Sequence, residues 1–219
     1  MVFSRNKDIP KLKLLINGNE IEQVKSFQYL GALVTEDGRC ECELNRRIAI
    51  AKNNFAKMSR ILTDHDLSLA TKIRLTQCYV WSTLLYGCET WSLTQTNEMK
   101  LRGLEMWMYR RIGRVSWKAK KTNEEVLNKL GLQSTKLMTV VRQRIVRFYG
   151  HVRRHDSLQR IITEGMVNGK RGRGRKRCGW LGNVSRYAGM NINRCAEIAT
   201  NREEWRTIVS NVVSDKEQR

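Results

Sequence analysis

The stretch LNRRIAIAKNNFAKMSRIL, residues 44–62, decides the fold class of this chain. Its apolar side chains recur at steps of three and four, which places them on one face of an α-helix. They are Leu44, Ile48, Ala51, Phe55, Met58 and Leu62. Basic side chains such as Arg46, Arg47 and Lys52 lie elsewhere around that helix, so the segment predicts an amphipathic helix with one buried face.

The same period continues downstream. Ser68 is predicted to cap a second helix that runs through Ile73 and Val80 and ends near Gly87. A third helix carries one apolar stripe, formed by Leu101, Leu104, Met108 and Ile112. A single proline, Pro10, in the whole chain fits long uninterrupted elements, because proline breaks helix interiors.

Further capping signals predict three shorter or later helices. Thr122 and Glu125 have the spacing of a capping box, and the helix that they begin should stop at Gly131. Ser134 is predicted to cap a fifth helix, and Asn201 a short helix near the end of the chain. The fifth helix has an apolar face formed by Leu137, Val141, Ile145 and Phe148.

The first 36 residues follow a β pattern instead. The stretch KLKLLINGNEIEQV alternates around Asn17-Gly18, a strong hairpin signal because both central positions of such a turn need positive φ. SFQYLGALV then predicts a strand interrupted by Gly31, and TEDG closes the region with turn residues. The expected fold is therefore mainly α, with a short N-terminal β hairpin region, a helical bundle and a small basic helical C-terminal part.

The charge of the chain points to an anionic partner. Lys and Arg number 41 against 21 Asp and Glu, which leaves a net charge of +20 among 219 residues. A field of this sign attracts polyanions, so we expect nucleic acid, RNA or DNA, as the partner. No apolar run approaches the ~18 residues that a membrane span needs, so no membrane partner is expected. Six cysteines scattered in a chain without a secretory signal indicate a reducing nuclear or cytoplasmic compartment.

The basic excess is concentrated between Arg142 and Arg177, where twelve Lys or Arg stand against Asp156 and Glu164. Glycines predict that residues 165–179 form a loop, and KRGRGRKR within it cannot form a core. Arginines spaced by glycines can lie in a groove while the backbone approaches phosphates. A nuclear-import patch remains the alternative interpretation of this loop.

Catalytic and metal-binding signals are weak. Asp64 and Asp66 bracket His65 at a predicted helix junction, where capping and turn roles are favoured over chemistry. His151 and His155 are four residues apart and could form a zinc site with Cys178 and Cys195, but a packed or phosphate-facing His151 is favoured. We therefore expect no metal, no cofactor and no catalytic residues. Trp117 lies among cations in a predicted loop, where base stacking is the alternative to packing.

Six stretches occur in an order that resembles the C-terminal half of LINE-type (non-LTR) retrotransposon reverse transcriptases. The resemblance covers about residues 2–213. The stretches are FQYLGALVTEDG, ELNRRIAIAKNNFAKM, LLYGCETW, LEMWMYRRI, RFYGHVRR and GKRGRGRKRCGWLGNV.

The resemblance implies a division of the chain. Residues 1–38 would be the end of a polymerase palm, 39–116 a helical thumb-like bundle, and 117–219 a basic nucleic-acid-binding domain. A primer grip would be formed by Phe27, Tyr29, Leu30 and Gly31. The paired catalytic aspartates of such a polymerase would precede Met1, so the expectation is a fragment that holds template–primer, element RNA or target DNA without catalysis.

The cations and aromatic residues of these regions form the predicted nucleic-acid-binding set. It consists of Arg46, Arg47, Arg110, Arg111, Trp117, Arg142, Arg144, Arg147, His151, Arg153, Arg154, Lys170, Arg171, Arg173, Arg175, Lys176 and Arg177.

Two other functions remain open from the sequence. EEVLNKLGLQSTKLMTVVRQRIVRF has the pattern helix, glycine-bearing turn, basic helix, which would suit a stand-alone helix-turn-helix DNA-binding regulator. Histidines and cysteines together could instead form a metal-dependent nuclease. Sequence-specific binding would distinguish the regulator from a polymerase fragment. Metal analysis of the purified protein would distinguish the nuclease.

Overall fold

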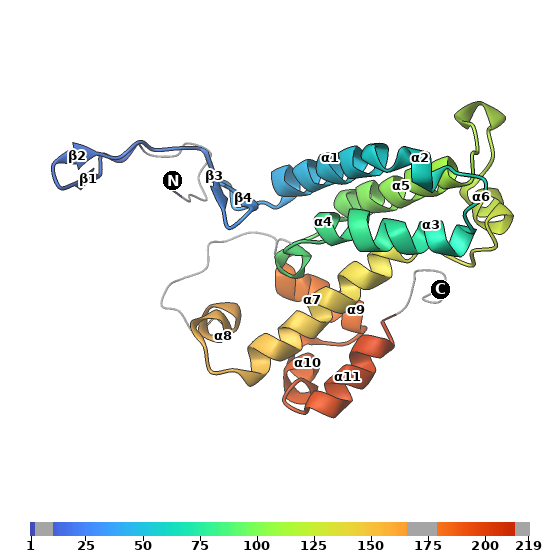
Figure 1. Ribbon diagram of the computed structural model, residues 1–219. Helices are drawn as coiled ribbons and strands as arrows, with labels where there is room; N and C mark the ends of the chain where they lie inside the picture. Colours follow the sequence, from blue (N-terminus) through green and yellow to red (C-terminus); the bar gives the residue numbers. More distant parts are fainter. Residues whose placement is uncertain (3–10, 166–178, 213–219) are drawn as a thin grey trace.

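A computed structural model of the chain describes residues 1–2, 11–165 and 179–212. Its elements are almost all helices, with small β hairpins at the N-terminal end (Figure 1). This confirms the predicted mainly α fold class. The strands are β1 (Leu15–Ile16), β2 (Asn19–Glu20), β3 (Ser26–Tyr29) and β4 (Ala32–Thr35).

The helices follow from Glu41 onward. The first group is α1 (Glu41–Lys57), α2 (Ser59–Leu62), α3 (Leu69–Leu75), the π-helical η1 (Thr76–Trp81), α4 (Ser82–Leu84), the 3₁₀ turn η2 (Cys88–Thr90) and α5 (Gln95–Ile112). The second group is the 3₁₀ turn η3 (Trp117–Ala119), α6 (Asn123–Lys129), α7 (Leu137–Arg154), α8 (Leu158–Thr163), α9 (Trp180–Ala188), α10 (Ile192–Ile198) and α11 (Arg202–Ser210).

Both hairpins turn on a pair of residues with positive φ. Asn17 and Gly18 have φ of 50° and 80°, which confirms the predicted turn between β1 and β2. Leu30 and Gly31 have φ of 46° and 78°, so the segment expected to be one interrupted strand is instead a second hairpin, β3–β4. Sequence alone missed this turn because leucine rarely adopts positive φ.

One hydrophobic core runs through the helices. It includes Leu44 on α1, Leu101 on α5, Ile145 on α7 and Val209 on α11. Helix α7 is central, because it packs against α5, η2, α9 and α11 (Figure 1). This core therefore joins residues on both sides of position 116, where the resemblance divides the chain.

Most predicted helix starts are confirmed. Ser68 accepts a hydrogen bond from Thr71 N at 3.2 Å at the start of α3, and Gly87 has the left-handed φ of 70° expected where that helical run ends. Thr122 and Glu125 form the full capping box of α6. Asn201 Oδ1 accepts hydrogen bonds from the first turn of α11.

The predicted cap of α7 is wrong. The helix begins at Leu137, and Ser134 does not cap it. Glu105 of α5 does so instead: its carboxylate oxygens accept hydrogen bonds from Lys136 N at 2.8 Å and Leu137 N at 3.0 Å. A carboxylate at a helix N-terminus satisfies free N–H groups and complements the helix dipole. The cap comes from a residue 31 positions away, which local sequence cannot show.

Two further helices, α8 and α9, were not predicted. Helix α9 follows the predicted glycine-rich loop and buries Val184 and Tyr187 against the bundle. Over residues 1–2, 11–165 and 179–212, no helix combines the length and the apolar character that crossing a lipid bilayer demands.

Candidate nucleic-acid interface

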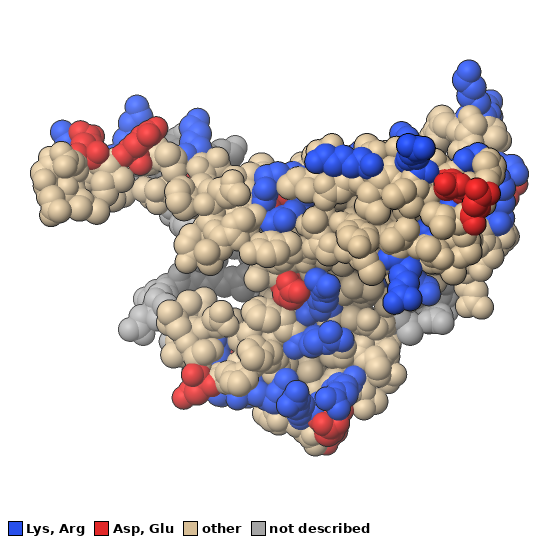
Figure 2. All heavy atoms as spheres, in the orientation of Figure 1, with Lys and Arg blue, Asp and Glu red and all other residues tan. Residues whose placement is uncertain are grey.

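A groove of about 1080 Å³ lies between α7 and α11. Five arginines line it: Arg144, Arg147, Arg154, Arg202 and Arg206. Glu89 is the acidic residue of the same lining, and His151 contributes an exposed imidazole. Figure 2 shows Lys and Arg side chains gathered over α7 and α11 in the lower half of the molecule. A concave surface lined mostly by one charge concentrates ions of the opposite charge.

Two of these arginines have no counter-charge in the part of the chain that the structure describes. Within the described residues, Arg147 and Arg202 have no hydrogen-bonding or ion-pair partner, and both are exposed. Arg206 forms an exposed ion pair with Glu203 at 3.1 Å, and Arg144 lies 3.5 Å from Glu89. Because exposed pairs are weak, an incoming phosphate could replace the carboxylate at little cost.

Arg154 and Arg202 oppose each other across the groove. Burial, followed by the positive charge of Arg202, lowers the pKa of Arg154 from its ordinary value. Arg154 is held in place by a hydrogen bond from Nη1 to the carbonyl oxygen of Ala199 at 2.9 Å. Like charges that are held together in this way gain stability when an anion binds between them.

The floor of the groove is apolar and fixed. Trp205 of α11 is buried and donates a hydrogen bond from Nε1 to the carbonyl oxygen of Val146 at 2.9 Å. Its ring centroid lies 5.6 Å from that of Tyr149. Gly150 leaves room for the indole at the point where the two helices meet. The groove arginines therefore stand on a rigid support.

The described structure resumes beside this groove after the predicted basic loop. Lys170, Arg171, Arg173, Arg175, Lys176 and Arg177 lie outside the described residues. At the end of the loop, Trp180 donates a hydrogen bond to the carbonyl oxygen of Glu89 at 2.8 Å. Its ring centroid lies 5.9 Å from that of Phe148, which lines the groove. The chain therefore re-enters the described structure next to the arginines.

Two arginines of the predicted nucleic-acid-binding set are internal, and their assignment is corrected. Arg47 is 7% exposed, donates to Glu43 at 2.6 Å and stacks 4.6 Å above the Tyr86 ring. Arg142 is 5% exposed and pairs with Glu98 at 3.2 Å. A guanidinium that is buried against an internal carboxylate does not face solvent, so these two side chains are not placed to contact a ligand.

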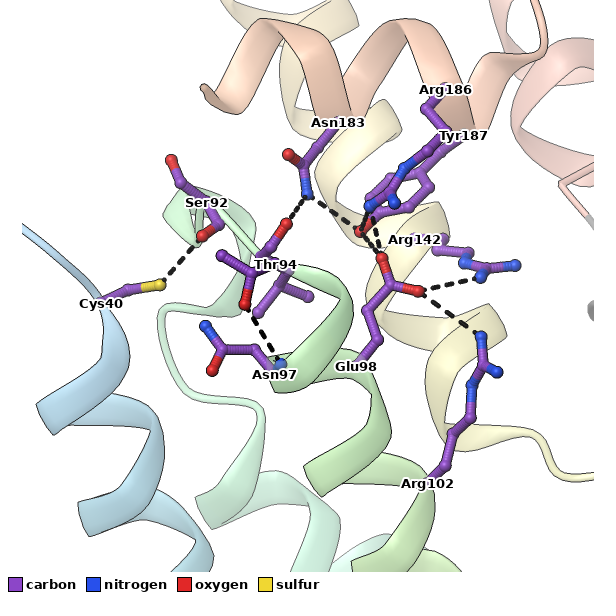
Figure 3. Close-up of polar contacts among 11 residues, drawn as sticks. Cys40, Ser92, Thr94, Asn97, Glu98, Arg102, Arg142, Asn183, Arg186 and Tyr187 are labelled. Carbon is purple, nitrogen blue, oxygen red and sulfur yellow. Dashed lines mark hydrogen bonds and ion pairs between the residues drawn. The ribbon is translucent and has the colours of Figure 1, made fainter. Parts of the chain in front are cut away.

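Glu98 is the centre of the second of these networks. Figure 3 shows its carboxylate among Arg102, Arg142, Arg186 and Tyr187, which come from α5, α7 and α9. Tyr187 donates its hydroxyl hydrogen to Glu98 at 2.8 Å, and burial together with this carboxylate raises the pKa of Tyr187 to about 12. The network joins α9 to the bundle.

Three predicted cations combine a structural bond with partial exposure. Arg46 donates to Glu43 at 2.7 Å and to the carbonyl oxygen of Gly31 at 2.5 Å. Arg144 donates to the carbonyl oxygen of Leu85 at 3.2 Å. Arg153 forms an ion pair with Glu164 at 2.5 Å and donates to Ala196 O at 3.2 Å. Of these three, the groove includes Arg144 alone.

The primer-grip-like residues form the tip of the β3–β4 hairpin. Leu30 is 74% exposed, and Phe27 and Tyr29 are also exposed. The backbone of the tip is nevertheless fixed, because Tyr86 donates to the carbonyl oxygen of Leu30 at 2.8 Å and Arg47 to that of Gly31 at 2.5 Å. Exposed aromatic side chains on a fixed turn are suited to contact a bound partner.

Arg110, Arg111 and Trp117 lie together at the far end of α5. Trp117 is 82% exposed, so the favoured prediction that it packs in the core is wrong. The Arg110 guanidinium lies 5.3 Å from its ring centroid, and that of Arg111 lies 4.3 Å from the ring centroid of Trp107. Figure 2 shows a second group of basic side chains at this upper right end of the molecule.

The structure places only part of the candidate zinc site, because Cys178 lies outside the described residues. Among the residues that the structure describes, no group of three His, Cys, Asp or Glu side chains could hold a metal ion. The His151 and His155 rings lie 4.3 Å apart, and Cys195 is buried. The cysteines that the structure describes are free thiols.

Sequence reasoning missed Arg202 and Arg206. They are four residues apart on α11, next to the buried Trp205 and Val209, and all four residues line the groove. That spacing was a usable signal, because residues i and i+4 share a helix face. No protein-family model, curated protein or solved structure matches this chain.

Proposed function

We propose that this chain binds nucleic acid and that the groove between α7 and α11 is its phosphate-binding surface. The observation that carries the proposal is the pair of exposed guanidiniums of Arg147 and Arg202, which have no partner among the described residues, beside Arg154 and Arg206. Arginine binds phosphate through parallel N–H groups, and each contact displaces a condensed cation from the nucleic acid. The net charge of +20 supports the same partner at long range.

The resemblance to LINE-type reverse transcriptases gives the proposal its finer form. The chain would be the thumb-like and C-terminal part of an RNA-directed DNA polymerase, holding template–primer, element RNA or target DNA. The tip of the β3–β4 hairpin would contact the primer through Phe27 and Tyr29. Under this proposal the chain does not polymerise by itself, because its sequence contains no two adjacent aspartates of the kind expected at the catalytic centre.

Helix α7 supports this function better than a helix-turn-helix regulator. A recognition helix must present its N-terminal residues to the bases. Leu137 and Val141, near the start of α7, are fully buried, and Arg142 is paired internally. The α7 arginines that line the groove, Arg144, Arg147 and Arg154, lie from the middle of the helix to its C-terminal end.

The proposal is tested by measuring binding of the full chain to labelled duplexes of equal length and different sequence. An RNA–DNA hybrid, a primed DNA and two scrambled DNA duplexes should bind with similar affinities, because phosphates are the same in all of them. A large loss on scrambling one particular sequence would favour a regulator. Failure of every duplex to bind at low salt would overturn the proposal.

A further inference from the structure

The loop that follows α5 contains a second feature, the exposed side chain of Trp117, which lies outside the groove lining. Trp117 is 82% exposed, whereas Trp81, Trp91 and Trp205 are buried. An indole ring left in water has a large apolar area without a partner. Among the described residues between 100 and 157, Trp117 is the one large hydrophobic side chain that is exposed.

The loop that carries Trp117 is held in place. Arg110 of α5 donates to the carbonyl oxygen of Lys121 at 2.8 Å and to Asn123 Oδ1 at 3.1 Å. On the other side, Arg114 donates to the carbonyl oxygen of Thr63, and Lys129 Nζ donates to that of Gly113 at 3.1 Å. The exposed ring is therefore presented on an anchored segment, which reduces the entropy lost when a ligand orders it.

A pocket of about 590 Å³ lies against this ring. Trp107, Met106 and Asn123 help to line it, together with Arg110 and Arg111. Trp107 already has partners on its ring: Phe55 edge-on at 5.2 Å, Arg111 at 4.3 Å and Lys52 at 5.7 Å. The ring of Trp117 has the Arg110 guanidinium 5.3 Å from its centroid and is still 82% exposed, so it can accept an incoming planar group.

The surrounding charge restricts what that group can be. The lining of this pocket contains arginines and no Asp or Glu, and Lys118, Lys120 and Lys121 follow Trp117 as exposed cations. An aromatic ring next to cations suits a planar base attached to a phosphate, the combination found in single-stranded nucleic acid. A membrane surface would call for several neighbouring apolar side chains, which this loop does not expose.

Resting on the proposed nucleic-acid function, we propose that Trp117 stacks on an unpaired nucleobase of a single strand. Arg110, Arg111 and the lysines of the loop bind the flanking phosphates. The chain thus has two contact modes: the groove binds phosphates of any strand, and the Trp117 pocket binds bases that are not paired. A junction between duplex and single strand would use both.

The test measures binding of the full chain to a fluorescently labelled single strand of oligodeoxyadenylate. A blunt duplex and inorganic polyphosphate are the two comparison ligands, and their affinities are measured in the same way. Stacking contributes roughly 1–3 kcal/mol per base, so Trp117→Ala should weaken single-strand binding by about five-fold to about 150-fold. Trp117→Phe should retain most of the affinity. Polyphosphate and blunt-duplex binding should not change, because neither offers an unpaired base.

A groove variant separates this inference from the proposed function. Arg147→Gln with Arg202→Gln should weaken binding of all three ligands, including polyphosphate. If wild type binds the duplex and Trp117→Ala binds the single strand as well as wild type does, the base-stacking site is wrong and the phosphate groove stands. If wild type binds no nucleic acid, the proposed function itself is wrong.

Two further outcomes would also overturn the stacking site. One is an equal loss of polyphosphate and single-strand affinity in Trp117→Ala, which would make the residue important for charge placement alone. The other is that anionic lipid vesicles displace the labelled single strand from wild type but not from Trp117→Phe, which would assign Trp117 to a lipid surface. Because Trp117 is exposed, its replacement should leave the far-ultraviolet circular dichroism unchanged.

Discussion

Gly150 of α7 faces the indole of Trp205 of α11 so closely that a Cβ at position 150 would lie 2.1 Å from Cδ1 of Trp205. No side chain can occupy that space unless α11 moves. The same contact forms the floor of the arginine-lined groove, since Trp205 and Arg154 both line it. The spacing of α7 and α11, and with it the shape of the groove, therefore depends on Gly150, which has no side chain.

Gly150→Ala should separate α11 from α7. Overpacking of this kind costs about 1–3 kcal/mol, and the Trp205–Val146 hydrogen bond would be strained or lost. Urea unfolding followed by tryptophan fluorescence measures the loss. Gly103→Ala is the matched control, because a Cβ there meets nothing within 4 Å. It lies inside helix α5, where Ala is favoured over Gly by about 0.5–1 kcal/mol. Equal effects of the two substitutions would contradict the close packing.

Glu43 attaches the β3–β4 hairpin to α1, and Glu43→Gln should loosen the hairpin. Its carboxylate accepts hydrogen bonds from Arg46, Arg47 and Leu33 N. Removing one partner of a buried charge pair costs about 3 kcal/mol. Hydrogen exchange of residues 26–35 should accelerate in the variant. Glu41→Gln on the same helix is the control, because Glu41 forms an exposed pair with Lys100 and should change little.

The same attachment should weaken in acid. Burial raises the pKa of Glu43, but hydrogen bonds from Arg46 and Arg47 outweigh it, and the net pKa lies below its ordinary value of 4.5. A depressed pKa gives stability that is present above 4.5 and lost as pH falls through the folded-state value. The difference in unfolding free energy between wild type and Glu43→Gln should therefore shrink in that range. A difference that does not depend on pH would show that the ion pair is unimportant.

Glu105 should behave in the opposite way. Burial raises the pKa of its carboxyl above the ordinary 4.5, despite hydrogen bonds from Tyr109, Lys136 N and Leu137 N. Stability from a raised pKa is complete below 4.5 and is lost as pH rises through the folded-state value. The free energy of unfolding of wild type should therefore fall, relative to that of Glu105→Gln, as the pH rises from 4.5 toward neutrality. Denaturant unfolding across this range measures the slope, and a positive slope would contradict the burial of this cap.

The β1–β2 hairpin should be the least protected described element in hydrogen exchange. Each strand has two residues, and Leu15 and Ile16 are about 60% exposed. Isolated two-stranded hairpins are marginally stable in water. Exchange of residues 15–20 should therefore be complete long before that of the α7 core. Protection equal to that of α7 would show that the hairpin is covered, for example by association through its free edges.

The helical part of the fold could be predicted because its signals are local. The apolar faces of α1, α5 and α7 repeat at helical spacing, and Thr122 and Glu125 form a cap within one turn. Helix α9 could not be predicted, because Gly182 interrupts it and its stability depends on distant contacts. Asn183, for example, donates to the carbonyl oxygen of Leu93 at 2.8 Å, across 90 residues.

Part of the candidate site could also be predicted, because some of its contacts are local in the sequence. Arg47 follows Glu43 by four residues, so its internal pairing was readable as an i, i+4 pair. Arg142 pairs with Glu98 across 44 residues, and no local rule reveals that. A basic stretch shows how much charge is present, whereas only the packing shows which arginines are already neutralised. Arg147 and His151 were predicted from their stretch alone, and the groove brings them together with Arg202 and Arg206.

The salt dependence of duplex binding tests the central claim most directly. If about six phosphates are contacted, the slope of log K against log salt should be about −5 for wild type. Replacing Arg147, Arg202 and Arg206 with Gln should reduce the magnitude of that slope by about 2.7, because three phosphate contacts are lost. Replacing Lys57, Arg60 and Arg74 with Gln removes the same charge from exposed positions on α1, α2 and α3, outside the groove lining, and should change the slope much less. An affinity that does not depend on salt, or equal slopes for the two triple variants, would contradict the groove as the nucleic-acid interface.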